Sequence, residues 1–433
     1  MKKLYYTDKN FEQSLKSLYD RAPFPPEAEK AAADIIADVR RDGDKALIKF
    51  AEKFDHIQLT PENMVVSEEE IKEACRKLSA ADKRAVRKAF EHIKVFAKAT
   101  LPLSWSASPR PGVTVGEKFT PMDRVGVYIP GGTAPLVSSV LHTAGIAAAA
   151  GVKEIVGCTP PGGMHPATLY AMKLAGVKTI YRLGGAYAVA AMAIGTETVK
   201  KVEKVVGPGN AYVTAAKKLL YGEVAIDLVA GPSEILVIAD KTADPSFVAA
   251  DLLSQAEHGS GLEQAVMVTD CKEMIEKVEA EVLRQKATLP REQIVDRVLD
   301  NGVFLICVPD MDKACELAGN YAPEHLEIQT ATPAKWAKKI RSAGAIFMGR
   351  WTPESAGDFC AGPSHVLPTA SSAHSFNGLE TSSFIRRTSI VKYSEAALRR
   401  EADIIERFGN MEMLAAHGRA ATIRVKKKPD CSR

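Results

Sequence analysis

The spacing of apolar residues changes character near residue 124 of this 433-residue chain. From about residue 26 to residue 97, apolar side chains recur at i, i+3 and i+4, as in EAEKAAADIIADVRRDGDKALIKFAEKF. This period is typical of amphipathic helices. We therefore expect successive helices over this stretch, with an interruption at Gly43.

From Arg124 onward, short β-branched runs alternate with alanine-rich segments. The expected strands are VGVYIP, EIVGCTPP and TIYRLGG, followed by ILVIAD, AVMVTD, VFLICVPD and AIFMGR. The expected helices that follow the first three strands are SSVLHTAGIAAAAGV, PATLYAMKLAGV and AYAVAAMAIG. Such alternation with apolar strands indicates parallel sheets covered on both faces, and we predict two α/β units. Beyond Thr369 we expect a small helical appendage and then a short strand, ATIRVK.

Composition excludes several classes of protein. The net charge is +4, from 57 basic and 53 acidic residues that are interspersed along the chain, so we expect no nucleic-acid partner. No apolar run approaches the roughly 18 residues of a membrane span, and MKKLYYTDKNF lacks the apolar stretch of a signal peptide. The seven cysteines form no C-x-x-C pair, which favours a reducing cytoplasm.

Three stretches carry side chains at spacings that a metal site could use. They are Gln255 and His258 in SQAEHG, Asp358 and His365 in GDFCAGPSH, and Glu412 and His417 in EMLAAHG. Zinc favours imidazole nitrogen and carboxylate oxygen. Asp244 and Pro245 are suited to the start of a helix, and Gly259 is suited to its end. Such a helix would place Gln255 and His258 on one face of its last turn. The alternative is that these two side chains bond exposed carbonyl groups at a helix end.

The segment YAPEHLE places a carboxylate, Glu324, beside an imidazole, His325, directly after a proline. In an extended or turn conformation neighbouring side chains diverge, so the two groups could serve different proton transfers. The alternative is a surface turn with a solvated glutamate. We expect Cys158 and Cys360 to be small buried residues rather than a nucleophile and a ligand.

Glycine-rich turns recur at PGGTAP (130–135), PPGG (160–163), GGAYA (184–188) and GPGN (207–210). Before a helix, such turns can present backbone N–H groups to phosphate. No G-x-G-x-x-G occurs in them. These turns therefore allow either a dinucleotide site or ordinary connections from strand to helix.

Taken together, these segments resemble the histidinol dehydrogenase family from about residue 20 to residue 425. The densest similarity lies in RVGVYIPGGTAPLVSSVLHTA, GPGNAYVTAAKK, IDLVAGPSEILVIAD, LLSQAEHG, YAPEHLEI, GDFCAGPSHVLPT and AAHGRAATIRV. Many long blocks in the same order are more specific than any single motif.

The resemblance implies a role for each of a set of residues. It implies zinc ligands at Gln255, His258, Asp358 and His417, and substrate contacts at these ligands and at Ser233, His325, His365 and Glu412. It implies proton transfer by Glu324 and His325, and NAD contacts at Tyr128 and Asn210. The family's third NAD contact is a glutamine, where this chain has Tyr187, which could stack or donate through its hydroxyl group.

The resemblance also implies the architecture: two incomplete Rossmann-like units with small terminal appendages, in a domain-swapped homodimer. We expect an N-terminal arm (1–24), a split α/β domain with metal and catalytic residues (25–125 and 238–380), and a second Rossmann-like domain with the NAD contacts (126–237). A small C-terminal domain (381–433) would complete the partner's active site.

The implied reaction is the zinc- and NAD-dependent oxidation of L-histidinol through L-histidinal to L-histidine. Three alternatives stay open at this point. They are a related dehydrogenase of another polar alcohol such as a sulfonated diol, a zinc hydrolase without NAD that uses Glu324 as base, and a binding protein without activity. The presence of Glu324, His365 and Glu412 together favours histidinol.

Overall fold

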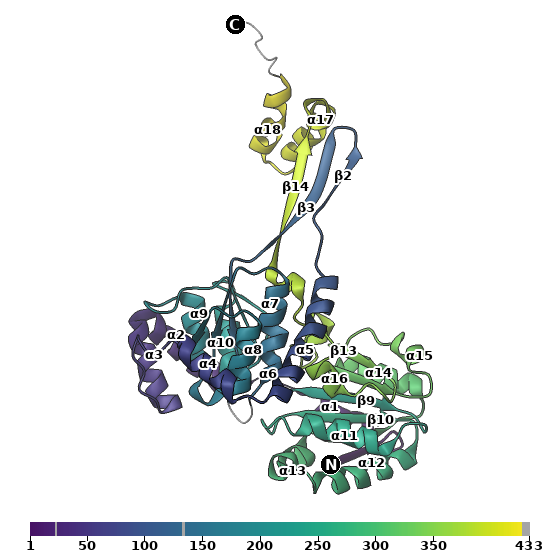
Figure 1. Cartoon of the computed structure of the whole chain (residues 1–433). Coiled ribbons are helices and arrows are strands. Elements are labelled where there is room, and N and C mark those ends of the chain that lie inside the picture. The colour runs from purple at the N-terminus through teal and green to yellow at the C-terminus, as the bar shows by residue number, and fades with distance from the viewer. Residues whose placement is uncertain (22–23, 132–134, 427–433) are drawn as a thin grey trace. The chain divides into compact units, whose positions relative to one another are not determined.

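The computed structural model describes residues 1–21, 24–131 and 135–426, and its chain divides into two compact units (Figure 1). Met1–Thr100 and Met122–Phe384 form the first unit. Leu101–Pro121 and Ile385–Arg433 form the second. No helix among the described residues is long and apolar enough to cross a membrane.

A six-stranded parallel sheet, in the order β1-β11-β10-β9-β12-β13, organises one half of the first unit. Its strands are β1 (Lys2–Tyr5), β9 (Glu234–Ala239), β10 (Gln264–Thr269), β11 (Val303–Cys307), β12 (His325–Gln329) and β13 (Ala345–Met348). The inner strands β9 and β11 are buried along their whole length, which explains their apolar runs, whereas the equally buried β12 carries His325, Glu327 and Gln329.

Helices cover both faces of this sheet (Figure 1). Ile235 and Val237 of β9 face a core built with α11 (Pro245–Ala256), α12 (Lys272–Lys286) and α13 (Glu292–Asn301). Leu236 and Ile238 face the opposite core, built with α1 (Phe11–Tyr19) and α14 (Met311–Tyr321). Successive side chains of a strand point to opposite faces, so one apolar run supplies two cores. Three shorter elements complete this half: α15 (Pro333–Ala337), α16 (Glu354–Phe359) and η4 (Ser372–His374).

A second parallel sheet, in the order β6-β5-β4-β7-β8, organises the other half of the first unit. Its strands are β4 (Arg124–Tyr128), β5 (Glu154–Cys158), β6 (Thr179–Tyr181), β7 (Lys204–Val206) and β8 (Ala225–Ile226). The intervening helical segments are α6 (Val137–Val140), η2 (Leu141–Gly145), α7 (Ile146–Ala149), η3 (Pro161–Gly163), α8 (Pro166–Leu174), α9 (Gly185–Ile194) and α10 (Ala211–Leu220), and η5 (Thr381–Phe384) ends the unit. The predicted mixed α/β fold with two parallel sheets is thus confirmed.

The predicted N-terminal helices are present as α2 (Pro26–Asp42), α3 (Asp44–Phe50), η1 (Ala51–Asp55), α4 (Glu68–Lys77) and α5 (Ala80–Ala99). Gly43 separates α2 from α3 at φ 54°, where a Cβ atom would collide with Glu197. The apolar side chains of α2 share a core with α9 and α10. Helices α2 and α3 therefore pack with the second sheet, and the expected domain boundaries stay a prediction.

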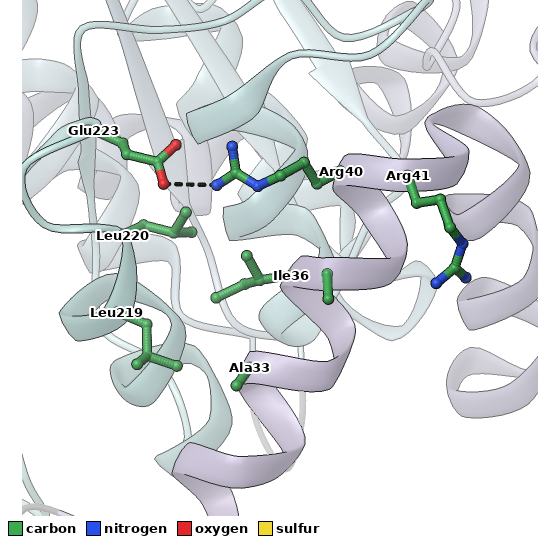
Figure 2. A pocket seen from close by; sticks show the side chains of 8 residues that line it. Ala33, Ile36, Arg40, Arg41, Leu219, Leu220 and Glu223 are labelled. Atoms are coloured by element: carbon green, nitrogen blue, oxygen red, sulfur yellow. Dashed lines mark hydrogen bonds and ion pairs between the residues drawn. The ribbon is translucent and has the colours of Figure 1, made fainter.

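A shallow groove of about 560 Å³ lies between α2 and α10 (Figure 2). Ala33, Ile36 and Leu220 contribute to its apolar lining. Arg40 and Glu223 form an ion pair of 2.6 Å at its edge. None of the predicted functional residues lines this groove.

The second unit combines an antiparallel sheet, in the order β14-β3-β2, with two helices. Its elements are β2 (Trp105–Arg110), β3 (Val113–Pro121), β14 (Ile385–Tyr393), α17 (Glu395–Met411) and α18 (Ala415–Lys426). The strand predicted at ATIRVK is wrong, because these residues form the last turns of α18, which packs against α17. Tertiary packing has overridden the β-branched composition of that segment.

Candidate active site

The predicted proton-transfer residues Glu324 and His325 lie at the amino end of β12, next to the amino end of the neighbouring strand β9. Glu234 begins β9 and His325 begins β12, and Ile235 pairs with His325 in the parallel register. Helix α11 follows β9 and must run back across the sheet, so its last turn, with Gln255, returns to the same edge. The fold therefore brings residues that are far apart in the sequence to this edge.

Glu324 lies in the turn between α14 and β12 and is 5% exposed. Ala322 makes the turn sharp by adopting the left-handed conformation at φ 48°. The Oε2 atom of Glu324 accepts hydrogen bonds from the Ser233 hydroxyl (2.8 Å) and from the backbone N–H of Glu234 (2.9 Å). Burial raises the pKa of Glu324 well above its ordinary value, which strengthens the carboxylate as a base.

His325 is almost fully buried, and its two ring nitrogens have different surroundings. Nδ1 lies 3.1 Å from the carbonyl oxygen of Glu234, which can only accept, so Nδ1 carries the hydrogen of the neutral ring. Nε2 lies 3.8 Å from both Glu354 Oε1 and Asp358 Oδ1. Burial lowers the pKa of His325, although Glu354 opposes this effect, so Nε2 presents a free lone pair at neutral pH.

Three ligand-type atoms, from His258, Glu354 and Asp358, lie within 4.8 Å of one another. His258 is exposed in the turn after α11, while Glu354 and Asp358 belong to the short helix α16. Burial, followed by the neighbouring Glu354 carboxylate, raises the pKa of Asp358 to about 9. Two crowded carboxyl groups of this kind would be stabilised by a cation.

Gln255 gives a separate indication of a bound group at this place. Its side chain is fully buried, and neither its amide oxygen nor its amide nitrogen has a hydrogen-bond partner among the described residues. Glu354 Oε1 is likewise buried without a partner. Unsatisfied buried polar atoms are costly, so both oxygens fit ligands of an ion or of a polar substrate.

His365 lies in the same region, held through both ring nitrogens. Nδ1 lies 3.1 Å from the carbonyl oxygen of Asp358, and Nε2 lies 3.3 Å from the Ser139 hydroxyl. The ring stacks on His142 with 4.3 Å between centroids. Burial lowers the pKa of His142 to about 4 and holds that of His365 well below its ordinary value, so both rings are neutral at pH 7.

Glu412 and His417 belong to the second unit. Glu412 follows α17, and His417 lies in the first turn of α18; both are exposed. Met413, between them, adopts φ 55° and turns the chain from one helix to the other. Their participation in the site stays a prediction.

The predicted NAD contacts lie in the half of the first unit built on the second sheet. The Tyr128 hydroxyl accepts a hydrogen bond of 3.0 Å from the N–H of Gly185, at the start of α9. Asn210 caps α10 by accepting from the N–H groups of Tyr212 and Val213. Tyr187 is 1% exposed and its hydroxyl donates to Asp55. Contact of these residues with NAD stays a prediction, and for Tyr187 the hydroxyl is already occupied.

A buried ion pair holds the GPGN turn that carries Asn210. Lys217 and Asp227 pair with each other, and both side chains are almost inaccessible. The Lys217 ammonium donates to the carbonyl oxygen of Gly207 (2.9 Å), and Asp227 accepts from the N–H of Gly207 (2.7 Å). Gly207 has φ 123°, and a Cβ atom there would collide with Tyr128, so this turn requires glycine.

Two of the other glycine-rich turns also precede helices as expected, at Pro161–Gly163 and at Gly184 before α9. Half of PGGTAP, residues 132–134, lies outside the described residues. Cys158 is buried as predicted, whereas the prediction for Cys360 is wrong: it is exposed after α16, where the helix ends.

The sequence analysis did not identify Glu354, Glu234, Arg21 and His142 in the region of Glu324 and His325. It also did not identify Lys217 and Asp227 at the GPGN turn. Glu354 lies four residues before Asp358 in one helix, a spacing that places two side chains on one face, and could have been found from it. The others act through tertiary contacts that carry no local signal.

Comparisons with known proteins relate this chain to one family. The family model for histidinol dehydrogenase matches residues 22–425. The chain is 43% identical over 431 residues to the histidinol dehydrogenase of Neisseria meningitidis serogroup A, covering 98% of this chain and 100% of the relative. It is 43% identical to that of Geobacter metallireducens, covering 98% of each chain. The crystal structure of histidinol dehydrogenase from Elizabethkingia anophelis superposes with a TM-score of 0.93, at 37% identity and 98% coverage of both chains.

Proposed function

The chain belongs to the histidinol dehydrogenase family, oxidoreductases of histidine biosynthesis, and we propose that it oxidises L-histidinol to L-histidinal and then to L-histidine at one site. Two NAD would be reduced in succession. The proposal rests on the different hydrogen bonds of Glu324 and His325, which are adjacent in sequence. Glu324 accepts from the N–H of Glu234, whereas His325 donates to its carbonyl oxygen.

His325 would be the base of the first oxidation. Its Nδ1–H is committed to the Glu234 carbonyl, so only Nε2 can take the proton of the substrate hydroxyl as hydride leaves the adjacent carbon. The protonated ring would then be stabilised by Glu354, whose Oε1 atom lies 3.8 Å from Nε2. Both alcohol oxidation and the later hydrate oxidation release a proton that Nε2 can accept.

Glu324 would act between the two hydride transfers. Its raised pKa suits removal of a proton from water as the water oxygen attacks the aldehyde carbon, giving the hydrate of L-histidinal. Ser233 and the N–H of Glu234 both bond to Oε2, which leaves Oε1 free to face water. Buried surroundings would also retain the reactive aldehyde between the steps.

Zinc fits the residues present, because Gln255, His258 and Asp358 offer the oxygen and nitrogen donors it favours and Gln255 is otherwise unsatisfied. His417 would complete the set from the second unit. Bound zinc would supply a positive centre that holds the imidazole and amine nitrogens of the substrate. NAD would accept the hydride of each oxidation, held by Tyr128 and Asn210. We propose a domain-swapped homodimer as the assembly in which these residues meet.

An assay of NADH formation tests this function. The purified protein with zinc, NAD and L-histidinol should produce NADH and L-histidine. A sulfonated diol in place of L-histidinol should give no NADH, and its preferential oxidation would favour the related polar-alcohol dehydrogenase. Conversion of substrate without any NADH would instead favour a hydrolase.

A further inference from the structure

The peptide groups of Glu234 hold both residues of the proposed proton-transfer pair. Its carbonyl oxygen lies 3.1 Å from His325 Nδ1, and its N–H lies 2.9 Å from Glu324 Oε2. A rotation or shift of this short stretch of backbone would move both groups at once. Whatever fixes Glu234 therefore fixes the catalytic geometry.

The side chain of Glu234 is fixed by Arg21, which comes from a distant part of the chain. The two side chains are buried and form an ion pair of 2.6 Å between Nη1 and Oε1. Glu234 Oε1 also accepts from the N–H of Ala370 at 2.9 Å. Burial raises the pKa of the Glu234 carboxyl, and Arg21 is the charge that opposes this rise.

Arg21 reaches the same pair from a second direction. Its Nη2 donates to the carbonyl oxygen of Tyr321 at 2.7 Å, and its guanidinium lies 3.6 Å from the centroid of the Tyr321 ring. Tyr321 ends α14 directly before Ala322, whose left-handed conformation directs the chain into Glu324. A non-glycine residue at positive φ is strained and persists only where surrounding contacts hold it.

Arg21 thus bonds to both segments that converge on the pair while touching neither of its members. Ion pairs of this kind contribute little net stability, because desolvation offsets the attraction, so stability alone does not account for a buried arginine here. Its planar guanidinium holds five N–H donors in fixed directions, whereas the ammonium of lysine is a compact point charge. Nη2 uses this property, since it also donates to the Ser371 hydroxyl at 2.5 Å.

We propose that Arg21 is a positioning residue, which sets the orientation of His325 and Glu324 through Glu234 and Tyr321. The inference rests on the proposed function for the identity of the pair. An active-site group displaced by about 1 Å can cost roughly 100-fold in rate, so a residue that controls this placement acts on the chemical steps more than on binding.

The test compares three single variants with the wild type. Arg21→Met keeps the length of the aliphatic stem and removes the guanidinium; Glu234→Gln keeps the shape of its partner and removes the charge. Arg124→Met is the matched control, because Arg124 is also a largely buried arginine in an ion pair, with Glu154, in the other sheet. For each, kcat, both KM values, bound zinc and Tm are measured.

For Arg21→Met we expect kcat to fall by about 10- to 100-fold, with both KM values within about threefold of wild type and zinc retained. Arg124→Met should lower Tm while leaving kcat within about twofold of wild type. Equal kcat values for Arg21→Met and Arg124→Met would overturn the positioning role. If Arg21→Met does not fold, Glu234→Gln decides on the same criterion.

A second readout needs no substrate and so separates this inference from the proposed function. In the wild type the His325 Nδ1–H should give a slowly exchanging proton resonance in NMR, assigned by its absence in His325→Asn. Loss or at least about tenfold faster exchange of that resonance in Arg21→Met, or in Glu234→Gln, supports the inference. An unchanged resonance overturns it. A wild type that makes no NADH from L-histidinol refutes the proposed function, while the resonance still decides the role of Arg21.

Discussion

The Nε2 atom of His325 lies 3.8 Å from Oε1 of Glu354, a buried carboxylate oxygen with no hydrogen-bond partner among the described residues. Glu354 also accepts from the Ser254 hydroxyl through its other oxygen. The carboxylate is therefore held beside the ring nitrogen that would receive the substrate proton. This relationship gives the first prediction.

Glu354→Gln should lower kcat for oxidation of L-histidinol while the enzyme retains zinc. The amide oxygen can still ligate a metal, but it cannot stabilise protonated His325; each pKa unit lost by the ring would reduce proton transfer about tenfold. Single-turnover NADH formation and metal analysis check this. An unchanged single-turnover rate would show that the charge of Glu354 does not support His325.

Metal binding should depend on each of the two donors at the end of α11. His258→Ala and Gln255→Ala should each lose stoichiometric zinc. The first removes the exposed imidazole donor, and the second removes an amide oxygen that has no other partner among the described residues. Chelation of the wild type should abolish turnover, and added zinc should restore it. A fully active protein without bound metal would refute the site.

Much of the fold could be predicted from the sequence because most helices and strands have a recognisable local pattern of apolar residues. The apolar run of β9 and the periodic stripe of α2 predict their elements without reference to the rest of the chain. The prediction of a strand at residues 421–426 was wrong because these residues pack as a helix against α17, a tertiary contact that no local pattern contains. The β2–β3 hairpin was missed because β2 is exposed along its length and β3 is mostly half-buried, so neither strand carries a long apolar run.

The candidate site was accessible only in part. Chemistry-bearing motifs pointed to Glu324 and His325, but nothing local to the sequence connects Arg21 or Glu234 with them. Those links depend on the register of β9 against β12 and on side chains meeting in the core. A pattern can identify which groups react, whereas the groups that hold them emerge only from the fold.

NAD affinity should depend on the Lys217–Asp227 pair, which holds the turn proposed to contact NAD. The double variant Lys217→Met/Asp227→Asn removes both charges, so no unpaired charge stays buried, and it weakens the hold on Gly207. We expect KM for NAD to rise about tenfold with a smaller change in kcat. The opposite pattern, a fall in kcat with KM for NAD unchanged, would show that the turn affects the chemical steps rather than NAD binding.

Protonation of His142 should destabilise the protein in mild acid. Its pKa is about 4 in the folded state, against roughly 6.5 when unfolded, so between these values the unfolded chain binds the extra proton. Stability should therefore fall as pH drops from about 6.5 towards 4, by up to roughly 3 kcal/mol at the lower end. His142→Phe should lose this contribution. Denaturant unfolding across this pH range compares the two proteins, and parallel curves would contradict the assignment.

The proposed shared site can be tested by mixing inactive chains. If His325 and His417 act from different subunits, co-refolding His325→Asn with His417→Ala gives mixed dimers with one intact site each. Random pairing makes half of the dimers mixed, so about a quarter of wild-type activity should return. With mixed dimers verified by differential tags, activity that stays flat across mixing ratios would place both residues in one subunit's site.

The central claim is that Glu324 and His325 carry out two successive oxidations at one site. The measurement that tests it most directly is the ratio of NADH formed to L-histidinol consumed, with the products quantified in wild type and in Glu324→Gln. For the wild type we predict two NADH and one L-histidine per L-histidinol, without release of aldehyde. For Glu324→Gln we predict a ratio that falls towards one as L-histidinal accumulates, because hydride transfer from the alcohol continues while hydration of the aldehyde slows. A ratio of two in both proteins, with equal losses in both half-reactions, would contradict the division of labour between these two residues.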